Sequence, residues 1–363
     1  MSGGELDVLQ LSERDQKVLS AVVAGYIKSG EPVGSRTVSK KYGLQVSSAT
    51  VRNIMADLEE MGLLRQPYTS AGRLPTEKGL RFYLDSIMEF RSLDDEDRRT
   101  IRRAYEEARQ DIEELLRCTS QVLSNVCRQA GVVLWPKLNL TRFKHIEFVR
   151  LRPCRILVIV ISRSGLVRHS LLEWEEDISQ EELDKYSRYL NDLFQDIPLK
   201  EIKERILAEM RKEKVLFDEL FSRALQMGSQ VFQADLEDGN VYIEGQTNLL
   251  NNPEFCDVGG MRRIIKAFED KSRIVRLLDR ALKLNDTASI ILGPESEFEE
   301  LHEISLISST YGRKDSVLGV LGVIGPLRMD YPRIIPVVEF TAKLLNHLLE
   351  EESCETVDFQ WRS

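Results

Sequence analysis

Residues 12–75 carry the pattern that most limits what this chain can fold into: three short helical patterns are followed directly by two β-type runs. In the first helical pattern, Ser12 is a candidate N-cap, apolar residues recur at helical spacing, and Gly30 and Pro32 end the run. This spacing predicts a helix over residues 12–29.

The second and third helices follow at short intervals. The stretch SRTVSKKY fits a short helix that Gly43 stops, because glycine tolerates the positive φ of a tight turn. Ser47 or Ser48 then caps a third helix that runs to about Met61. Its predicted buried stripe consists of Val51, Ile54, Met55, Leu58 and Met61. This spacing is typical of a helix-turn-helix, with another face formed by Ala49, Arg52, Asn53 and Ala56.

A β-hairpin is predicted directly after the third helix. In GLLRQPYTSAGRLPT, we expect a strand near residues 63–66, a Thr-Ser-Ala-Gly turn, and a return strand near residues 73–75. Three helices and such a wing predict a winged helix-turn-helix. A helix fits the major groove of DNA, where small side chains permit close approach and Arg and Asn make bidentate contacts to bases. Wing arginines would hold phosphates or enter the minor groove.

The charge distribution favours DNA as the partner of this region. The whole chain has a net charge of -9, but eight basic against four acidic residues give +4 between Pro32 and Arg81, which leaves -13 elsewhere. The candidate DNA-binding residues are Arg36, Ser47, Ser48, Ala49, Thr50, Arg52, Asn53, Arg65, Tyr68 and Arg73. One alternative stays open, because some winged helices bind only proteins; the serines and Thr50 would then only cap the helix.

Other kinds of site find little support in the sequence. The five cysteines are scattered without a C-x-x-C pair and the four histidines stand alone, so we expect free thiols, no metal and no cofactor. No nucleophile and base are spaced for catalysis, so we expect no enzyme. The glycines of GVLGVIG indicate close strand packing, whereas DVGGMRR fits either an anion site or a turn. Without a long apolar run or a signal peptide, we expect a cytoplasmic protein that binds no membrane.

The rest of the chain predicts an α+β fold. Residues 95–131 are expected to be helical, and composition changes at GVVLWPKLNLTR. The runs KHIEFVRL, RILVIVISRSG and LVRHSLLEW then predict an antiparallel three-stranded meander. Helices are expected after it near residues 180–195, 199–210 and 213–233. A second β-containing unit starts at NVYIEGQTNLL, continues through a helical stretch GMRRIIKAFEDKSRIVRLLDRAL and three strands, and ends in the helix PRIIPVVEFTAKLLNHLLEE.

Long stretches of this sequence resemble one bacterial family. The N-terminal region of HrcA, the heat-inducible transcription repressor, is similar to PVGSRTVSKKYGLQVSSATVRNIMADLEEMGLLRQPYTSAGRLPTEKGLRFYLD. The similarity extends into VYIEGQTNLLNNPEF and GVLGVIGPLRMDYPRIIPVVEFTAKLL. The resemblance implies a homodimeric repressor of chaperone operons that binds the CIRCE inverted-repeat operator on double-stranded DNA and depends on the GroEL chaperonin for its active form. It maps DNA binding onto Ser47–Met61 and Leu63–Pro75.

The resemblance also implies a division into domains. A winged helix-turn-helix would occupy residues 1–90, a GAF-like domain residues 91–141 and 236–350, an inserted dimerisation domain residues 142–235, and a tail residues 351–363. For residues 91–350, the pattern of residues alone indicates only an α+β fold. A different class of function therefore stays open at this point: a protein-binding scaffold or small-molecule sensor whose winged helix has no operator.

Overall fold

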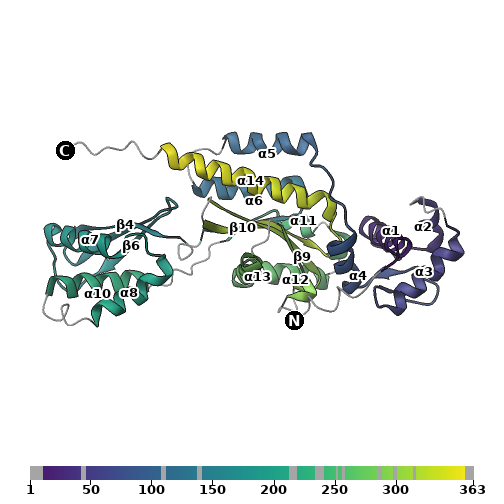
Figure 1. The fold of residues 1–363 in the computed structure, drawn as a ribbon, viewed down its shortest axis with the longest axis horizontal. Helices are drawn as coiled ribbons and strands as arrows, with labels where there is room; N and C mark the ends of the chain where they lie inside the picture. Colours follow the sequence, from purple (N-terminus) through teal and green to yellow (C-terminus); the bar gives the residue numbers. More distant parts are fainter. Residues whose placement is uncertain are drawn as a thin grey trace. The chain divides into compact units, whose positions relative to one another are not determined.

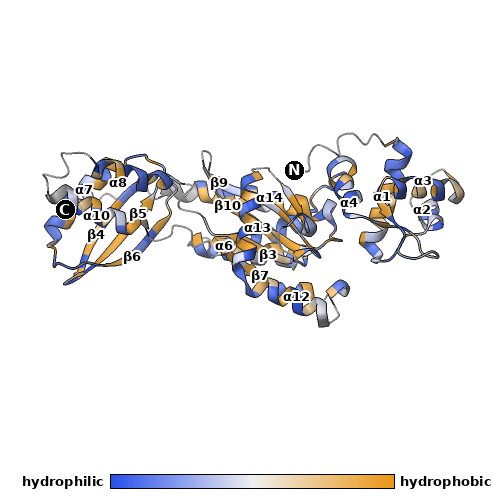
Figure 2. Ribbon diagram, turned by 90° about the horizontal axis from the view of Figure 1, so that it is seen from below, coloured by the Kyte–Doolittle hydropathy of each residue, from blue (hydrophilic) through white to orange (hydrophobic). Residues whose placement is uncertain are grey.

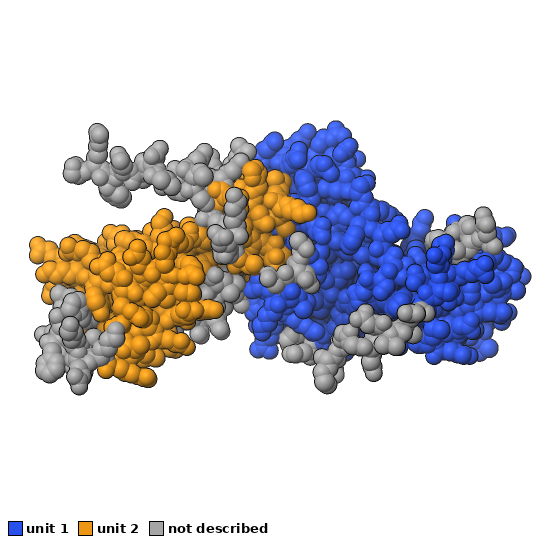
Figure 3. All heavy atoms as spheres, in the orientation of Figure 1, with its two compact units in different colours: residues 1–132, 243–309, 321–341 blue, residues 133–242, 310–320, 342–363 orange. Residues whose placement is uncertain are grey.

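The computed structural model describes residues 11–41, 46–107, 112–136, 141–211, 219–233, 241–250, 252–255, 258–284, 288–296, 301–313 and 316–355. Its helices and strands form an α+β fold (Figure 1), and apolar residues are concentrated on the strands of the two larger sheets (Figure 2). The chain divides into two compact units (Figure 3). The first comprises residues 1–132, 243–309 and 321–341, and the second comprises residues 133–242, 310–320 and 342–363.

Three helices begin the first unit, as predicted: α1 (Glu13–Ser29), α2 (Ser35–Lys41) and α3 (Ser48–Glu60). Ser12 caps α1 in a capping box with Asp15. Gly30 ends that helix in the left-handed conformation, with a φ of 73°. Because both caps can be recognised in the sequence, the predicted helix over residues 12–29 agrees closely with α1. Gly43, which was predicted to stop α2, lies outside the described residues.

The apolar stripe of α3 packs against α1 and α2. Val51, Ile54, Met55 and Leu58 are all buried there, as predicted. The inclusion of Met61 in this stripe is wrong, because Met61 is the C-cap residue and is 40% exposed. The chain turns away directly afterwards at Gly62, which has a φ of 73°.

A short antiparallel hairpin follows, made of β1 (Leu64–Arg65) and β2 (Leu74–Pro75). Leu64 faces Pro75 and Arg65 faces Leu74 across the pair. The chain before α2 joins this hairpin through an isolated antiparallel bridge between Val33 and Arg73. A Cβ atom on Gly72 would lie 2.4 Å from the carbonyl carbon of Val33, so only glycine allows this approach.

The chain leaves the hairpin through α4 (Glu77–Phe82) and the π-helical segment η1 (Tyr83–Ile87). The helices α5 (Asp95–Glu107) and α6 (Ile112–Cys127) follow. The prediction of helix throughout residues 95–131 is wrong at its end, because β3 (Ala130–Leu134) is a strand. Every residue of β3 is buried, so its sequence lacks the polar alternation that identifies a half-exposed strand.

A five-stranded sheet with the order β7-β3-β10-β9-β8 joins distant parts of the sequence. Its other strands are β7 (Val241–Glu244), β8 (Ser289–Leu292), β9 (Ile304–Arg313) and β10 (Ser316–Pro326). β8 pairs antiparallel with β9, and Ser289 faces Ser308. A Cβ atom on Gly322 of β10 would lie 2.2 Å from the carbonyl oxygen of Ile307, which confirms that this glycine serves close strand packing.

Helices lie on both faces of this sheet (Figure 1). They include α11 (Gln246–Leu250), α12 (Val258–Glu269), α13 (Lys271–Leu284) and α14 (Tyr331–Glu355), with the 3-10 turns η4 (Pro253–Phe255) and η5 (Gly293–Glu295) between them. Arg333 of α14 lies 3.3 Å from Asp97 of α5, and Arg98 lies 5.6 Å from the ring centre of Phe340. α5, α6 and α14 thus share one face of the sheet, and α12 and α13 lie on the other.

The second unit contains the predicted meander, with β4 (Phe143–Arg152), β5 (Arg155–Ser162) and β6 (Val167–Glu173) antiparallel in that order. The helices that follow are α7 (Gln180–Phe194), the 3-10 turn η3 (Leu199–Glu201), α8 (Ile202–Met210) and α10 (Glu219–Gln233). They form one core with the inner face of this sheet, including Phe148, Val158, Tyr186 and Met227. Residues 213–218 of the third predicted helix lie outside the described residues.

Candidate nucleic-acid interface

The first turn of α3 is capped by Ser47. Its side chain accepts the backbone N–H of Thr50 at 3.1 Å, and the two hydroxyl oxygens are 3.0 Å apart. Because the remaining N–H groups of a helix N-terminus carry partial positive charge, this end of α3 is suited to meeting an anionic backbone. The cap therefore fixes where the exposed face of α3 begins.

Small and polar side chains form the exposed face of α3. Ala49, Thr50, Arg52 and Asn53 are exposed, whereas the apolar stripe of the same helix faces α1 and α2. Arg52 and Asn53 carry the donors and acceptors that make paired hydrogen bonds with guanine and adenine edges. The geometry thus leaves the predicted reading residues accessible on one helix.

The side chain of Gln66 closes the loop of the hairpin. Gln66 donates through its amide nitrogen to the carbonyl oxygen of Thr69 at 2.9 Å and to that of Ala71 at 3.0 Å. The backbone N–H of Ala71 also donates to the carbonyl oxygen of Tyr68 at 2.9 Å. Tyr68 is 63% exposed at this turn, and Arg65 is exposed on β1. The hairpin therefore presents an aromatic ring and a guanidinium on a turn that Gln66 keeps compact.

Glu59 attaches the hairpin to α3. Its carboxylate accepts the backbone N–H of Gln66 at 2.9 Å and lies 2.8 Å from the guanidinium of Arg73. The side chain of Arg73 is only 17% exposed. Arg73 thus directs its charge toward α3, whereas the sequence placed it with the residues that contact phosphates. Neither Glu59 nor Gln66 was among the predicted site residues, and no motif in the sequence indicates their contacts.

The other candidate residues lie on the same N-terminal region, at the surface. The exposed ones are Arg36, Ser47, Ala49, Thr50, Arg52, Asn53, Arg65 and Tyr68, and the half-buried one is Ser48. Lys40 and Lys41 are also exposed at the end of α2. The predicted basic region is therefore a surface of the folded molecule, with Arg73 partly neutralised at its base.

Arg263, from the stretch considered as an anion site, lies 2.9 Å from Glu303. Within the described residues, no group of His, Cys, Asp and Glu side chains is arranged to hold a metal ion. No described helix is long and apolar enough to cross a membrane.

Comparison with known proteins gives one consistent result. The chain is 68% identical over 341 residues to the heat-inducible transcription repressor HrcA of Syntrophobacter fumaroxidans, which covers 94% of this chain and 98% of that protein. It is 48% identical over 342 residues to the HrcA of Geobacter sulfurreducens, covering 94% and 99%. A family model described as the HrcA protein C-terminal domain matches residues 113–335. A crystal structure described as a hypothetical protein shares the fold, with a TM-score of 0.55 and 20% identity over 94% of this chain and 99% of that one.

Proposed function

Because the chain belongs to the HrcA family of heat-inducible transcription repressors, we propose that it binds operator DNA through its first 90 residues, folded as a winged helix-turn-helix. Membership makes it a transcription repressor of the heat-shock response and not an enzyme. The observation that carries the DNA-binding proposal is the exposed face of α3, where Arg52 and Asn53 stand beside small side chains and the basic hairpin follows. Such a repressor acts where the chromosome is, in the cytoplasm.

The protein would make two kinds of contact with DNA, one to base edges and one to phosphates. α3 would enter the major groove, with Arg52 and Asn53 on base edges and the short side chains of Ala49 and Thr50 allowing close approach. The exposed Arg65 and Tyr68 of the hairpin, with Arg36 of α2, would meet the phosphate backbone. Ser47 and Ser48 at the N-terminus of α3 would add contacts to phosphates.

We further propose that the operator is the CIRCE inverted repeat and that a homodimer reads both halves. A two-fold symmetric site requires two reading helices at a fixed separation, and linking them raises affinity through effective concentration. The chain would supply the dimer contact through an inserted domain of residues 142–235. A GAF-like domain of residues 91–141 and 236–350 would carry the winged helix, and residues 351–363 would form a tail.

An open apolar sheet face supports the dimer. Helices cover one face of the meander. The opposite face carries Val149, Leu157 and Leu171, which lie in register across the three strands. Leu171 and Val167 are each 62% exposed. Apolar side chains gathered in this way favour association, because burial removes them from water.

The same surface supports a dependence on the GroEL chaperonin. A monomer with this face uncovered would be prone to aggregate, more so after heating. We propose that heat lowers the amount of folded dimer and that the chaperonin restores it when other unfolded proteins no longer occupy it. Repression would then follow the supply of available chaperonin.

The DNA-binding proposal is tested by electrophoretic shift with an intact CIRCE duplex and with a scrambled duplex of the same composition. Binding to the intact repeat should survive excess competitor DNA, and all binding should weaken with salt because counterions are released. Equal binding to both duplexes would instead indicate a protein-binding scaffold or a sensor without an operator.

The chaperonin proposal needs a separate experiment. Operator occupancy is measured after a heat step, with and without chaperonin and ATP, while light scattering follows the dimer. We expect occupancy and dimer to fall together and to recover together with chaperonin. Full occupancy after heating without chaperonin, or recovery with no change in soluble dimer, would contradict this mechanism and point to a ligand or a modification.

A further inference from the structure

The segment that follows the hairpin is fixed rigidly to it. Thr76 donates its hydroxyl to the carbonyl oxygen of Gly62 at 2.7 Å and caps α4 by accepting the N–H of Gly79 at 3.0 Å. A Cβ atom on Gly79 would lie 1.9 Å from the carbonyl oxygen of Leu63, so α4 packs directly against the chain that joins α3 to β1. α4 must therefore move together with α3 and the hairpin.

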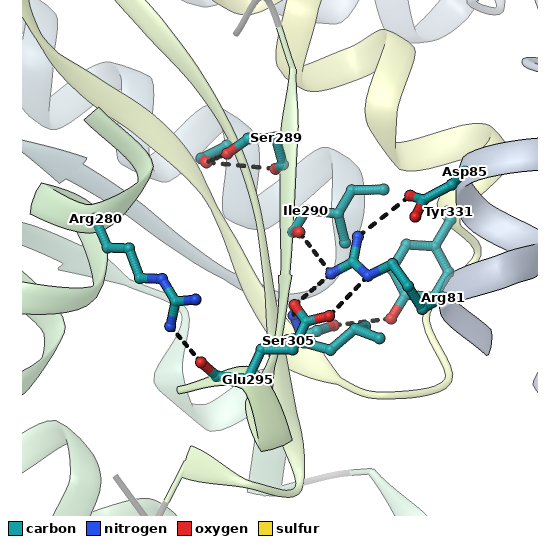
Figure 4. A network of polar contacts seen from close by, with 10 residues as sticks. Arg81, Asp85, Arg280, Ser289, Ile290, Glu295, Ser305 and Tyr331 are labelled. Carbon is teal, nitrogen blue, oxygen red and sulfur yellow. Dashed lines mark hydrogen bonds and ion pairs between the residues drawn. The ribbon is translucent and has the colours of Figure 1, made fainter. Parts of the chain in front are cut away.

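Arg81 joins α4 to the five-stranded sheet (Figure 4). Its Nε donates to one carboxylate oxygen of Glu295 at 2.7 Å, and a second guanidinium nitrogen donates to the other oxygen. That nitrogen also donates to the carbonyl oxygen of Ile290 at 3.0 Å, and the third nitrogen lies 3.4 Å from Asp85. The side chain of Arg81 is 18% exposed. A two-point contact of this kind fixes orientation as well as distance.

Glu295, the partner of Arg81, is itself held in place by hydrogen bonds. Glu295 ends the turn η5 directly after β8, which stands at the end of the strand order. Its carboxylate accepts the N–H of Leu292 at 3.0 Å, and its carbonyl oxygen accepts a hydrogen bond from Arg280. Burial lowers the pKa of Arg81, but the hydrogen bond and charge of Glu295 outweigh it, so the net shift is upward and the guanidinium stays charged.

A second arginine attaches α1 to the segment that follows β10. Arg328 follows β10, and its Nε donates to Glu254 at 2.6 Å, while another of its nitrogens lies 3.4 Å from the carbonyl oxygen of Ile27 near the end of α1. A Cβ atom on Gly30 would lie 3.1 Å from the guanidinium carbon of Arg328. Two attachments at separate helices leave the three-helix region little freedom to rotate on the sheet.

We propose that Arg81 and Glu295 are positioning residues that set the spacing between half-sites that the repressor accepts. Neither residue is on α3 or the hairpin, and the guanidinium of Arg81 is bound by Glu295 and by the carbonyl oxygen of Ile290, so neither residue is among the proposed contacts within one half-site. They fix the angle at which the five-stranded sheet holds α3, so loss of this contact adds a point of rotation between the two reading helices of a dimer. This inference rests on the proposed binding of an inverted repeat by a dimer.

The rigidity with which α3 is held determines how selective the repressor is for one spacer length. DNA turns once in about 10 base pairs, so each added base pair rotates one half-site by roughly 35° relative to the other. A rigidly held α3 loses contacts with DNA when its half-site rotates, whereas a loosely held α3 can follow the rotation. Loosening the Arg81 contact should therefore flatten the dependence of affinity on spacer length.

The test uses the full-length protein and a series of duplexes whose spacer is lengthened or shortened by about one to four base pairs. A further duplex keeps one half-site and scrambles the other. The variants are Arg81→Gln, Arg81→Lys, which keeps the charge but not the two-point geometry, and Glu295→Gln. Arg276→Gln is the control, since it removes the same charge from an exposed position of α13. Thermal melting of each variant reports its folding.

We expect the preference of wild type for its best spacer to fall about tenfold in Arg81→Gln and Glu295→Gln, and by less in Arg81→Lys. Affinity for the single half-site should change less than about twofold, and Arg276→Gln should behave as wild type. An unchanged spacer profile in well-folded Arg81→Gln and Glu295→Gln would overturn the inference, as would a parallel loss of half-site binding. If wild type fails to distinguish an intact half-site from a scrambled one, the proposed function fails instead.

Discussion

Replacing Glu59 by glutamine should strengthen non-specific DNA binding while it loosens the hairpin. Glu59 accepts the N–H of Gln66 at 2.9 Å and pairs with Arg73 at 2.8 Å. The amide oxygen of glutamine still accepts from Gln66, so the change mainly removes the ion pair. Since a third of the Glu59 side chain is exposed, water screens this pair, and we expect a loss of about 1 kcal/mol in the free energy of unfolding.

The released Arg73 should then reach a phosphate. One added phosphate contact steepens the slope of log affinity against log salt by about 0.9. The assay is fluorescence anisotropy with a scrambled duplex at several salt concentrations, together with urea unfolding for stability. Glu60→Gln is the matched control, because it makes the same charge change at the next, exposed position of α3. Equal slopes for the two variants would refute the reasoning, since the effect would then come from net charge and not from Arg73.

Further predictions concern two exposed residues of α3, one arginine of the hairpin and two cysteine thiols. Arg52→Ala and Asn53→Ala should each weaken operator binding by roughly 1–3 kcal/mol without changing unfolding, and unchanged titrations at fixed salt would remove both from the recognition surface. Arg65→Ala should lower affinity for intact and scrambled duplexes alike and flatten the salt slope by about 0.9, so a loss confined to the intact operator would mean that the hairpin reads sequence. Burial raises the pKa of Cys127 to about 12, so peptide mass spectrometry after thiol labelling near neutral pH should find the exposed Cys154 modified well before Cys127.

Local signals allowed the helices and the hairpin of residues 12–75 to be predicted closely. The Ser12 cap and Gly30 define α1, Ser47 defines the start of α3, and the turn before Arg73 indicates the hairpin. Each of these signals acts within a few residues of the structure that it specifies. The meander was equally visible, because turns separate its strands.

The contacts that join distant segments could not be predicted in this way. Arg81 and Glu295 are 214 positions apart, and nothing near either residue indicates the other. Arg73 was predicted to contact phosphates. Its pairing with Glu59 was missed because that pair forms only once the hairpin folds back on α3. The first two residues of β3 were predicted as the end of a helix, because a fully buried strand has no alternation to distinguish it from a buried helix.

Methylation protection of the operator tests most directly whether α3 reads DNA. The N7 atoms of guanine lie in the major groove, so a helix bound there shields them from a methylating reagent. We predict protected guanines in both half-sites with the wild-type protein, and selective loss of protection in Arg52→Ala at concentrations that keep the duplex bound. Full binding without protection of any guanine N7, or identical protection by Arg52→Ala, would contradict the assignment of α3 as the reading helix.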